Sequence, residues 1–179
     1  MLLNTRDSFG LIARMLHWLI AALVIGNLFG GAILSLFESG GMRTFVVSVH
    51  KSTGVIILLL MIIRIAWRMY NPQPRDLGNI PVLNFIAHVM HVWLYVLVIL
   101  QPLSGILMSQ AYGYPVIVFG AVKLPSLIWN SPALGVLFGE VHRVTSVVLM
   151  LTMSLHIAAA LKHHFLNRDN TLMRMLKGS

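Results

Sequence analysis

Four long stretches of the chain are almost wholly apolar, and polar residues gather in the segments between them. The stretches run over about 11–36, 45–70, 82–110 and 136–165. Each reaches the roughly 20 residues that a helix needs to cross the hydrocarbon core of a bilayer. Because backbone polar groups in lipid must be satisfied within their own segment, each stretch is predicted to be a transmembrane helix. The pattern predicts an all-α fold, an integral membrane four-helix bundle that forms one domain over residues 1–179.

Glycine and proline mark the connections between these stretches. Residues 38–44 are expected to form a short turn, and residues 71–81 hold three prolines that should end the second helix and keep the linker extended. The longest connection, residues 111–134, mixes prolines with tyrosine and tryptophan and is expected to form an ordered cap. Pro102 lies inside the third stretch and is expected to bend it.

The composition is that of a membrane protein. Of the 179 residues, 58% are hydrophobic and 10% are charged, and the mean hydropathy is +0.83, which excludes an ordinary soluble domain. The first stretch is too long for the apolar region of a secretory signal and is expected to be retained. The chain has no cysteine, which excludes disulfides, iron–sulfur clusters, and haem that is bound through thiolate or attached covalently.

Basic residues are divided unevenly between the two ends of the predicted bundle. One end, with the N-terminus, the second connection and the C-terminus, carries nine: Arg6, Arg14, Arg64, Arg68, Arg75, Lys162, Arg168, Arg174 and Lys177. The other end carries four: Arg43, Lys51, Lys123 and Arg143. Because short cytoplasmic segments carry the excess of Lys and Arg, both termini are predicted to be cytoplasmic. Contact with anionic lipid then accounts for the formal net charge of +8, and no nucleic-acid partner is expected.

An imidazole inside an apolar stretch is costly and marks a candidate site, and four of the histidines there can be paired by depth. His142 and His156 share the last stretch, 14 residues apart. On a helix this spacing corresponds to a rise of about 21 Å and to facing directions within roughly 40°. By the same count His17 matches the depth of His156, and His50 matches the depth of His142. We expect His17 and His156 to bridge one iron near the cytoplasmic end, and His50 and His142 another near the outer end.

Histidine pairs at two depths favour haem over a bare metal ion. A bare ion would need Asp, Glu or Cys nearby, and the predicted spans contain almost no acidic residues. A porphyrin fills an apolar slot between helices, and Gly30 and Gly31 are expected to let the first helix approach the outer ring. The residues therefore predict two b-type haems with bis-histidine iron. The alternative for any one of these histidines is a hydrogen bond between helices.

Two arginines are candidates for haem propionates at the inner site. Arg64 follows His50 by 14 residues and is expected to turn inward at cytoplasmic depth, where a guanidinium suits a carboxylate. Arg14, one turn before His17, has the same interpretation. For both residues the alternative is an arginine that reaches out to the lipid headgroups.

Four further histidines lie near the cytoplasmic end, and three of them, His88, His91 and His163, are site candidates. His88 and His91 share a face of the third stretch, and we expect them to hydrogen-bond a propionate or to line a quinone pocket. The alternative is that one of them replaces His17 as the inner ligand. His163 is expected to continue the face of His156, which makes it a candidate proton donor to a reduced quinone. Its alternative is a basic helix end that interacts with headgroups.

The motifs around these histidines resemble those of the bacterial cytochrome b561 family over nearly the whole chain. The resemblance is carried by Leu16-His17-Trp18, His50-Lys51-Ser52-Thr53-Gly54, Ala87-His88 with His91, Glu140-Val141-His142, and Leu155-His156 leading to Lys162-His163-His164-Phe165. The tail from Arg168 to Met175 is its most distinctive part. The family resemblance implies haem b at both sites, with the histidine pairs named above as the inner and outer ligands.

The resemblance also implies electron transfer between an outer donor and the quinone pool of the bacterial inner membrane. One type of member is similar to a superoxide:ubiquinone oxidoreductase, which takes electrons from superoxide and reduces ubiquinone. Members of that type carry lysine in the linker between the second and third helices. Here residues 71–81 contain no lysine, and Arg75 is their one basic residue.

Each outer histidine is followed directly by a cation, Lys51 after His50 and Arg143 after His142. In a superoxide oxidoreductase these charges are expected to draw the small anion to the haem edge, and the alternative is that they neutralise propionates.

A second interpretation is a haem-b membrane anchor and electron relay for a separate dehydrogenase subunit. Such a partner would dock on the cap at residues 111–134. The apolar candidates for that contact are Val116, Ile117, Val118, Leu127, Ile128 and Trp129. A haem-free channel is disfavoured, because the spans show no polar stripe besides the histidines.

Overall fold

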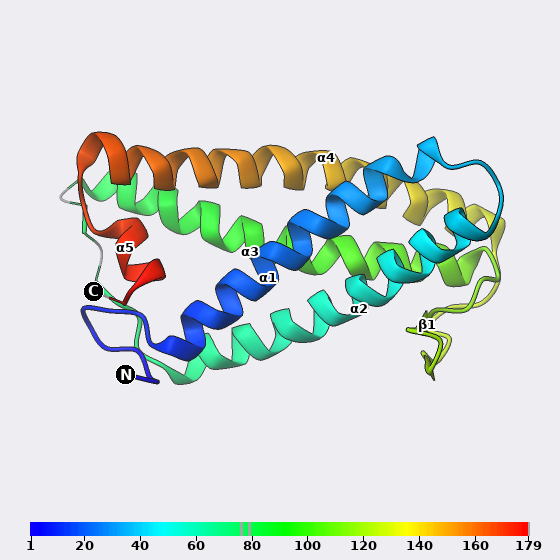
Figure 1. Cartoon of the computed structure of the whole chain (residues 1–179), viewed down its shortest axis with the longest axis horizontal. Helices are drawn as coiled ribbons and strands as arrows, with labels where there is room; N and C mark the ends of the chain where they lie inside the picture. Colours follow the sequence, from blue (N-terminus) through cyan, green and yellow to red (C-terminus); the bar gives the residue numbers. More distant parts are fainter. Residues whose placement is uncertain (76, 79, 179) are drawn as a thin grey trace.

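The computed structural model describes residues 1–75, 77–78 and 80–178. Its long helices run side by side along the molecule (Figure 1): α1 (Leu11–Ala32), α2 (Gly41–Tyr70), α3 (Pro81–Ala111) and α4 (Pro132–Lys162). In the described part of the chain, four helical segments are long and apolar enough to cross a membrane, and each contains one of these four helices. The predicted fold class, a helical bundle in the membrane, is confirmed.

Local sequence sets where the helices begin and end. Both α3 and α4 start with a proline, whose fixed φ suits the first turn of a helix and whose missing N–H costs nothing there. Ser131 caps α4 by accepting a hydrogen bond from the backbone N–H of Leu134 at 3.4 Å. Just beyond α3, Gly113 takes the positive φ of 81° that closes the following turn. Pro102 lies inside α3, which continues across it.

Shorter elements close the two ends of the bundle. They are the 3-10 turn η1 (Ile33–Leu36), the strands β1 (Ile117–Val118) and β2 (Val122–Lys123), the π-helical turn η2 (His163–Asn167), and the short helix α5 (Thr171–Leu176). The strands form an antiparallel hairpin in the cap between α3 and α4, which the hydropathy pattern did not predict. The cap is tied to α2, because the Ser52 hydroxyl accepts a hydrogen bond from the backbone N–H of Phe119 at 2.8 Å.

The helices pack in chain order, α1 on α2, α2 on α3, and α3 on α4. Their shared core lies in the middle of the bundle and takes residues from each of the four long helices: Ile20, Val24, Ile57, Met61, Leu97, Val98 and Leu149. A smaller cluster of Val55, Ile106 and Val116 joins α2 and α3 to the cap. Apolar layers therefore fill the centre, and polar groups are left to the two ends.

Both termini lie at one end of the bundle and the hairpin lies at the other (Figure 1). We call these the inner end and the outer end. At the inner end the tail helix α5 is fixed to α1, since the Arg14 guanidinium donates to the carbonyl of Leu176 at 2.9 Å and the Trp18 indole donates to that of Met175 at 3.0 Å. The Arg174 guanidinium donates to the carbonyl of Arg75 in the α2–α3 linker at 2.7 Å. The tail is thus part of the folded unit.

Replacing Leu149 with alanine should lower the free energy of unfolding by about 2 kcal/mol, because this side chain is 1% exposed and its packing contacts are lost without replacement. Leu151 is the matched control on the same helix, since it is 63% exposed and faces lipid. Unfolding in mixed micelles, followed by circular dichroism, measures both variants. Equal destabilisation by Leu149→Ala and Leu151→Ala would contradict the assigned core.

Candidate cofactor sites

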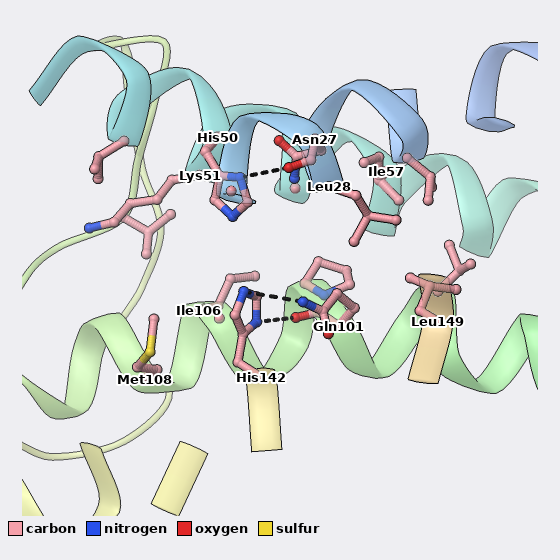
Figure 2. A pocket seen from close by; sticks show the side chains of 18 of the residues that line it. Asn27, Leu28, His50, Lys51, Ile57, Gln101, Ile106, Met108, His142 and Leu149 are labelled. Carbon is pink, nitrogen blue, oxygen red and sulfur yellow. Dashed lines mark hydrogen bonds between the residues drawn. The ribbon is translucent and has the colours of Figure 1, made fainter. Parts of the chain in front are cut away.

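The outer pair of histidines is brought together by α2 and α4. The ring centres of His50 and His142 lie 6.2 Å apart, with their planes at 84°, and the rings point toward one another across a cavity (Figure 2). A backbone carbonyl from another helix contacts the Nδ1 atom of each ring. His50 Nδ1 lies 3.1 Å from the oxygen of Asn27 on α1, and His142 Nδ1 lies 2.9 Å from the oxygen of Gln101 on α3.

The cavity between these rings has a volume of about 290 Å³. This volume is at the lower end of the range for cofactor pockets. All four long helices line it, mainly with apolar side chains such as Leu28, Ile57, Ile106 and Leu149 (Figure 2). An apolar slot with two inward-facing imidazoles suits a flat hydrophobic group that needs a metal ligand on each face.

The inner pair is brought together by α1 and α4. The ring centres of His17 and His156 lie 6.4 Å apart, with their planes at 74°. His91 on α3 also reaches this place, and its ring centre lies 5.4 Å from that of His156. Arg64 on α2 completes the group, with its Nη1 at 3.0 Å from His17 Nδ1 and its Nε donating to the Tyr95 hydroxyl at 3.1 Å.

The two ring separations fit a single iron between each pair. An imidazole nitrogen binds a first-row metal at about 2.0 Å, and the ring centre lies about 1.1 Å behind it, so two opposed rings have centres about 6.2 Å apart. The pairs His50–His142 and His17–His156 are close to this value at 6.2 and 6.4 Å. Two donors per site suit haem, because the porphyrin supplies the other four nitrogens.

Comparison with known proteins gives the family. A sequence profile described as prokaryotic cytochrome b561 matches residues 8–178 of the chain. The chain belongs to the prokaryotic cytochrome b561 family. It is therefore a membrane electron-transfer protein that binds b-type haem.

Curated relatives cover nearly the whole of this cytochrome. "Cytochrome b561 homolog 2" of Escherichia coli (strain K12) is 33% identical over 175 residues, which is 97% of this chain and 93% of the relative. "Probable superoxide oxidase CybB" of Yersinia pestis is 31% identical over 162 residues, or 90% and 91% of the two chains. "Cytochrome b561 homolog 1" of Escherichia coli (strain K12) is 26% identical over 164 residues, or 90% and 92%.

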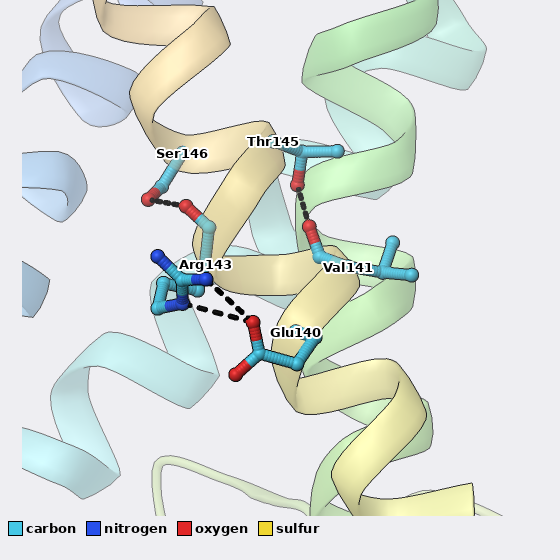
Figure 3. Close-up of polar contacts among 5 residues, drawn as sticks. All are labelled: Glu140, Val141, Arg143, Thr145 and Ser146. Carbon is cyan, nitrogen blue, oxygen red and sulfur yellow. Dashed lines mark hydrogen bonds and ion pairs between the residues drawn. The ribbon is translucent and has the colours of Figure 1, made fainter.

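The two outer cations of the cytochrome lie in different settings. Lys51 lines the outer cavity, and its ammonium donates to the Ser109 hydroxyl at 2.7 Å and lies 5.8 Å from the centre of the Tyr114 ring. Arg143 lies on the exposed side of α4, where its Nη2 pairs with Glu140 at 2.6 Å (Figure 3). Of the two predicted cations, the structure places Lys51 at the cavity and Arg143 in a surface ion pair.

Of the remaining predicted residues, some lie at the inner histidine pair and others lie away from it. Arg64 and His91 lie at the inner histidine pair, whereas Arg14 is engaged with the tail and His88 is exposed on α3. His163 begins the π-helical turn, and its Nδ1 lies 2.5 Å from a carboxylate oxygen of Asp169.

Several residues at the outer site were missed by sequence reasoning. Asn27 and Gln101 contact the histidines through backbone carbonyls, and the residue type does not indicate which carbonyl makes such a contact. The Gln101 side chain also takes part, with its amide nitrogen at 3.2 Å from His142 Nε2 and its oxygen accepting from the Thr145 hydroxyl at 2.5 Å. One lone pair cannot serve both an amide and an iron, so the Gln101 amide must leave His142 Nε2 when a metal binds there. Ser104 adds a hydroxyl at 3.3 Å from His142 Nδ1.

The contact between Asp169 and His163 fixes the start of the tail. Burial by itself raises the pKa of Asp169, but hydrogen bonds from His163 and Thr171 outweigh it and hold the pKa at about 2 instead of 3.8. A carboxyl whose pKa is lowered by folding stabilises the folded tail above pH 3.8, and this contribution is lost as the pH falls through about 2.

Replacing Asp169 with asparagine should loosen the tail at neutral pH. Trypsin should then cleave after Arg174 roughly fivefold faster, the change expected when about 1 kcal/mol of hydrogen bonding is lost. Asp7→Asn is the matched control, because it removes an exposed carboxylate from the other terminus at the same end. Mass spectrometry of the released peptides gives the rates, and equal rates in the two variants would contradict the role of the Asp169 contact.

Proposed function

We propose that this cytochrome holds two haems b and passes electrons from a donor at its outer end to a quinone near its inner end. His50 and His142 would bind the outer iron, and His17 and His156 the inner iron. The observation that carries the proposal is the pair of ring separations, 6.2 and 6.4 Å, at opposite ends of one bundle. A bis-histidine haem b exchanges single electrons and leaves no coordination position open for a substrate.

The choice of His17 as the inner ligand is supported by distance. His91 lies 5.4 Å from His156, ring centre to ring centre, which is short for two imidazoles on opposite faces of one iron. We assign His91 and Arg64 to the surroundings of the inner haem, where they can donate to a propionate or to a bound quinone. His88 is exposed one turn earlier on the same helix and is available to a quinone that enters from the lipid.

The orientation in the membrane rests on charge. The inner end holds both termini and the α2–α3 linker, and nine of the thirteen basic residues lie at this end. We propose that this end faces the cytoplasm of a bacterial inner membrane.

Superoxide is the donor that we propose. A relative named a probable superoxide oxidase is 31% identical over 90% of the chain. Lys51 places a positive charge at the outer cavity, where it attracts a small anion. Each superoxide gives up one electron and leaves as O₂. Two electrons and two protons then convert one quinone to quinol.

Protons for the quinone are supplied at the inner end in this proposal. His163 and Asp169 form a hydrogen-bonded pair at the end of α4, and both side chains are partly open to solvent. An imidazole with a carboxylate partner can take a proton from the cytoplasm and pass it on.

A second candidate function is electron relay for a separate dehydrogenase subunit. The cap exposes Leu127 and Trp129, with Trp129 at 73%, which suits an apolar partner. Val116 is buried against the bundle and is unavailable for such a contact. Activity of the purified single chain with superoxide separates the two functions.

The haem content tests the ligand assignment. Purified protein should contain two haems per chain by pyridine haemochrome assay. His142→Ala should remove the outer haem alone, and His156→Ala the inner haem alone, because the pairs share a helix and no ligand. Retention of both haems in His156→Ala, with loss of one in His91→Ala, would move the inner ligand to α3.

The direction of electron flow is tested by stopped-flow absorbance of the haems. Superoxide should reduce the wild-type haems, and added quinone should reoxidise them. Lys51→Gln should slow the reduction roughly tenfold at low ionic strength and weaken its salt dependence. Arg143→Gln removes the same charge from the surface pair with Glu140 and should have a smaller effect.

His163→Gln should leave reduction by superoxide fast and slow the reoxidation by quinone. If Lys51→Gln and Arg143→Gln slowed reduction equally, steering at the cavity would be wrong. If His163→Gln left reoxidation unchanged, the proposed proton supply would be wrong.

A further inference from the structure

The two outer histidines are held in the same way by two different helices. On α1, the carbonyl of Asn27 meets His50 Nδ1, and Gly31 follows four residues later. On α3, the carbonyl of Gln101 meets His142 Nδ1, and Gly105 follows four residues later. In both cases the helix that holds the ring is not the helix that supplies it.

Helix geometry explains why glycine stands at that spacing. The carbonyl of residue i points along the axis toward residue i+4, whose Cβ tilts back toward the N-terminus and lies beside that oxygen. A glycine at i+4 leaves the oxygen open on one side. Because a carbonyl oxygen has two lone pairs, it can accept from its own helix and from an imidazole as well.

The space left by each missing side chain is taken up by an imidazole. A Cβ built on Gly31 would lie 3.0 Å from His50 Cε1, and one built on Gly105 would lie 3.0 Å from His142 Cε1. Either distance is shorter than ordinary van der Waals contact, so the ring would have to move. The sequence grouped Gly30 with Gly31 beside the outer ring, but the structure separates them, because a Cβ on Gly30 meets nothing within 4 Å.

The carbonyl contact fixes the chemical form of each ring. A carbonyl can only accept, so Nδ1 of His50 and of His142 must carry the proton, and Nε2 keeps the lone pair that binds a metal. A hydrogen bond of this kind also makes the imidazole a stronger donor to the metal. The inner site lacks the arrangement at His17, whose Nδ1 faces the Arg64 guanidinium at 3.0 Å.

We propose that Gly31 and Gly105 are positioning residues for the outer haem, and that each opens a helix carbonyl which orients the opposite histidine and fixes its tautomer. The proposal rests on the assignment of His50 and His142 as the outer ligands. It explains why all four helices are needed to build a site with two ligands: α2 and α4 supply the rings, while α1 and α3 hold them.

The test compares Gly31→Ala and Gly105→Ala with Gly30→Ala in the purified haem-loaded protein. Alanine favours a helix over glycine, so any loss at the outer site cannot come from a weaker helix. Three measurements are made on each variant: haem content, the low-spin EPR signal of each ferric haem, and a redox titration.

In Gly31→Ala and Gly105→Ala, the affinity for the outer haem should fall on the order of tenfold or more. The EPR signal of that haem should shift as its ring planes rotate, and its midpoint potential should rise as the hydrogen bond to the carbonyl weakens. The inner haem should keep its signal and potential. Gly30→Ala should match the wild type in every measurement.

Two outcomes would overturn the proposal. One is that Gly31→Ala and Gly105→Ala are indistinguishable from Gly30→Ala. The other is that they lose both haems together, since the proposal confines the effect to the outer site. The ligand assignment fails separately, if His142→Ala retains the outer haem.

Discussion

An imidazole in the apolar interior of a bundle must find partners for both ring nitrogens, because water cannot reach it and an unpaired polar group in hydrocarbon is costly. The packing of the four helices brings hydrogen-bonding groups to the outer histidine rings. At the outer end, the backbone satisfies Nδ1 of His50 and His142 through carbonyls of α1 and α3. In the proposed outer site each Nε2 then binds the metal, so backbone groups that every helix possesses orient the two proposed ligands.

At the inner end a side chain, and not a backbone carbonyl, contacts the Nδ1 atom of His17. Arg64 lies against both His17 and Tyr95, and His91 lies beside His156. A charged guanidinium and an extra imidazole make this end more polar than the outer cavity, whose walls are mainly apolar. Such a difference is consistent with the proposed function, in which the outer end only exchanges electrons and the inner end also supplies protons to a quinone.

The ends of the bundle are closed by segments that are not part of the spans. At the outer end the hairpin cap is held to α2 through Ser52 and buries Val116. At the inner end α5 is held by Arg14 and Trp18, which flank His17 on α1. The tail is therefore linked to the helix that carries an inner histidine, and the contact between Asp169 and His163 joins its start to the end of α4. The apolar core around Leu97 and Leu149 keeps the two ends apart.

The sequence alone determined the membrane fold, the four spans and the depth of each histidine, because hydropathy and the helical repeat act along one chain and need no partner. It also placed Arg64 near the inner pair, since 14 residues return a helix to nearly the same face. The tertiary structure decided what depends on contacts between helices. It separated Lys51 at the cavity from Arg143 at the surface, and it moved Arg14 to the tail. It also revealed the carbonyls of Asn27 and Gln101 as partners of the histidines, which sequence could not do, because every residue has a carbonyl and only packing shows which one is open.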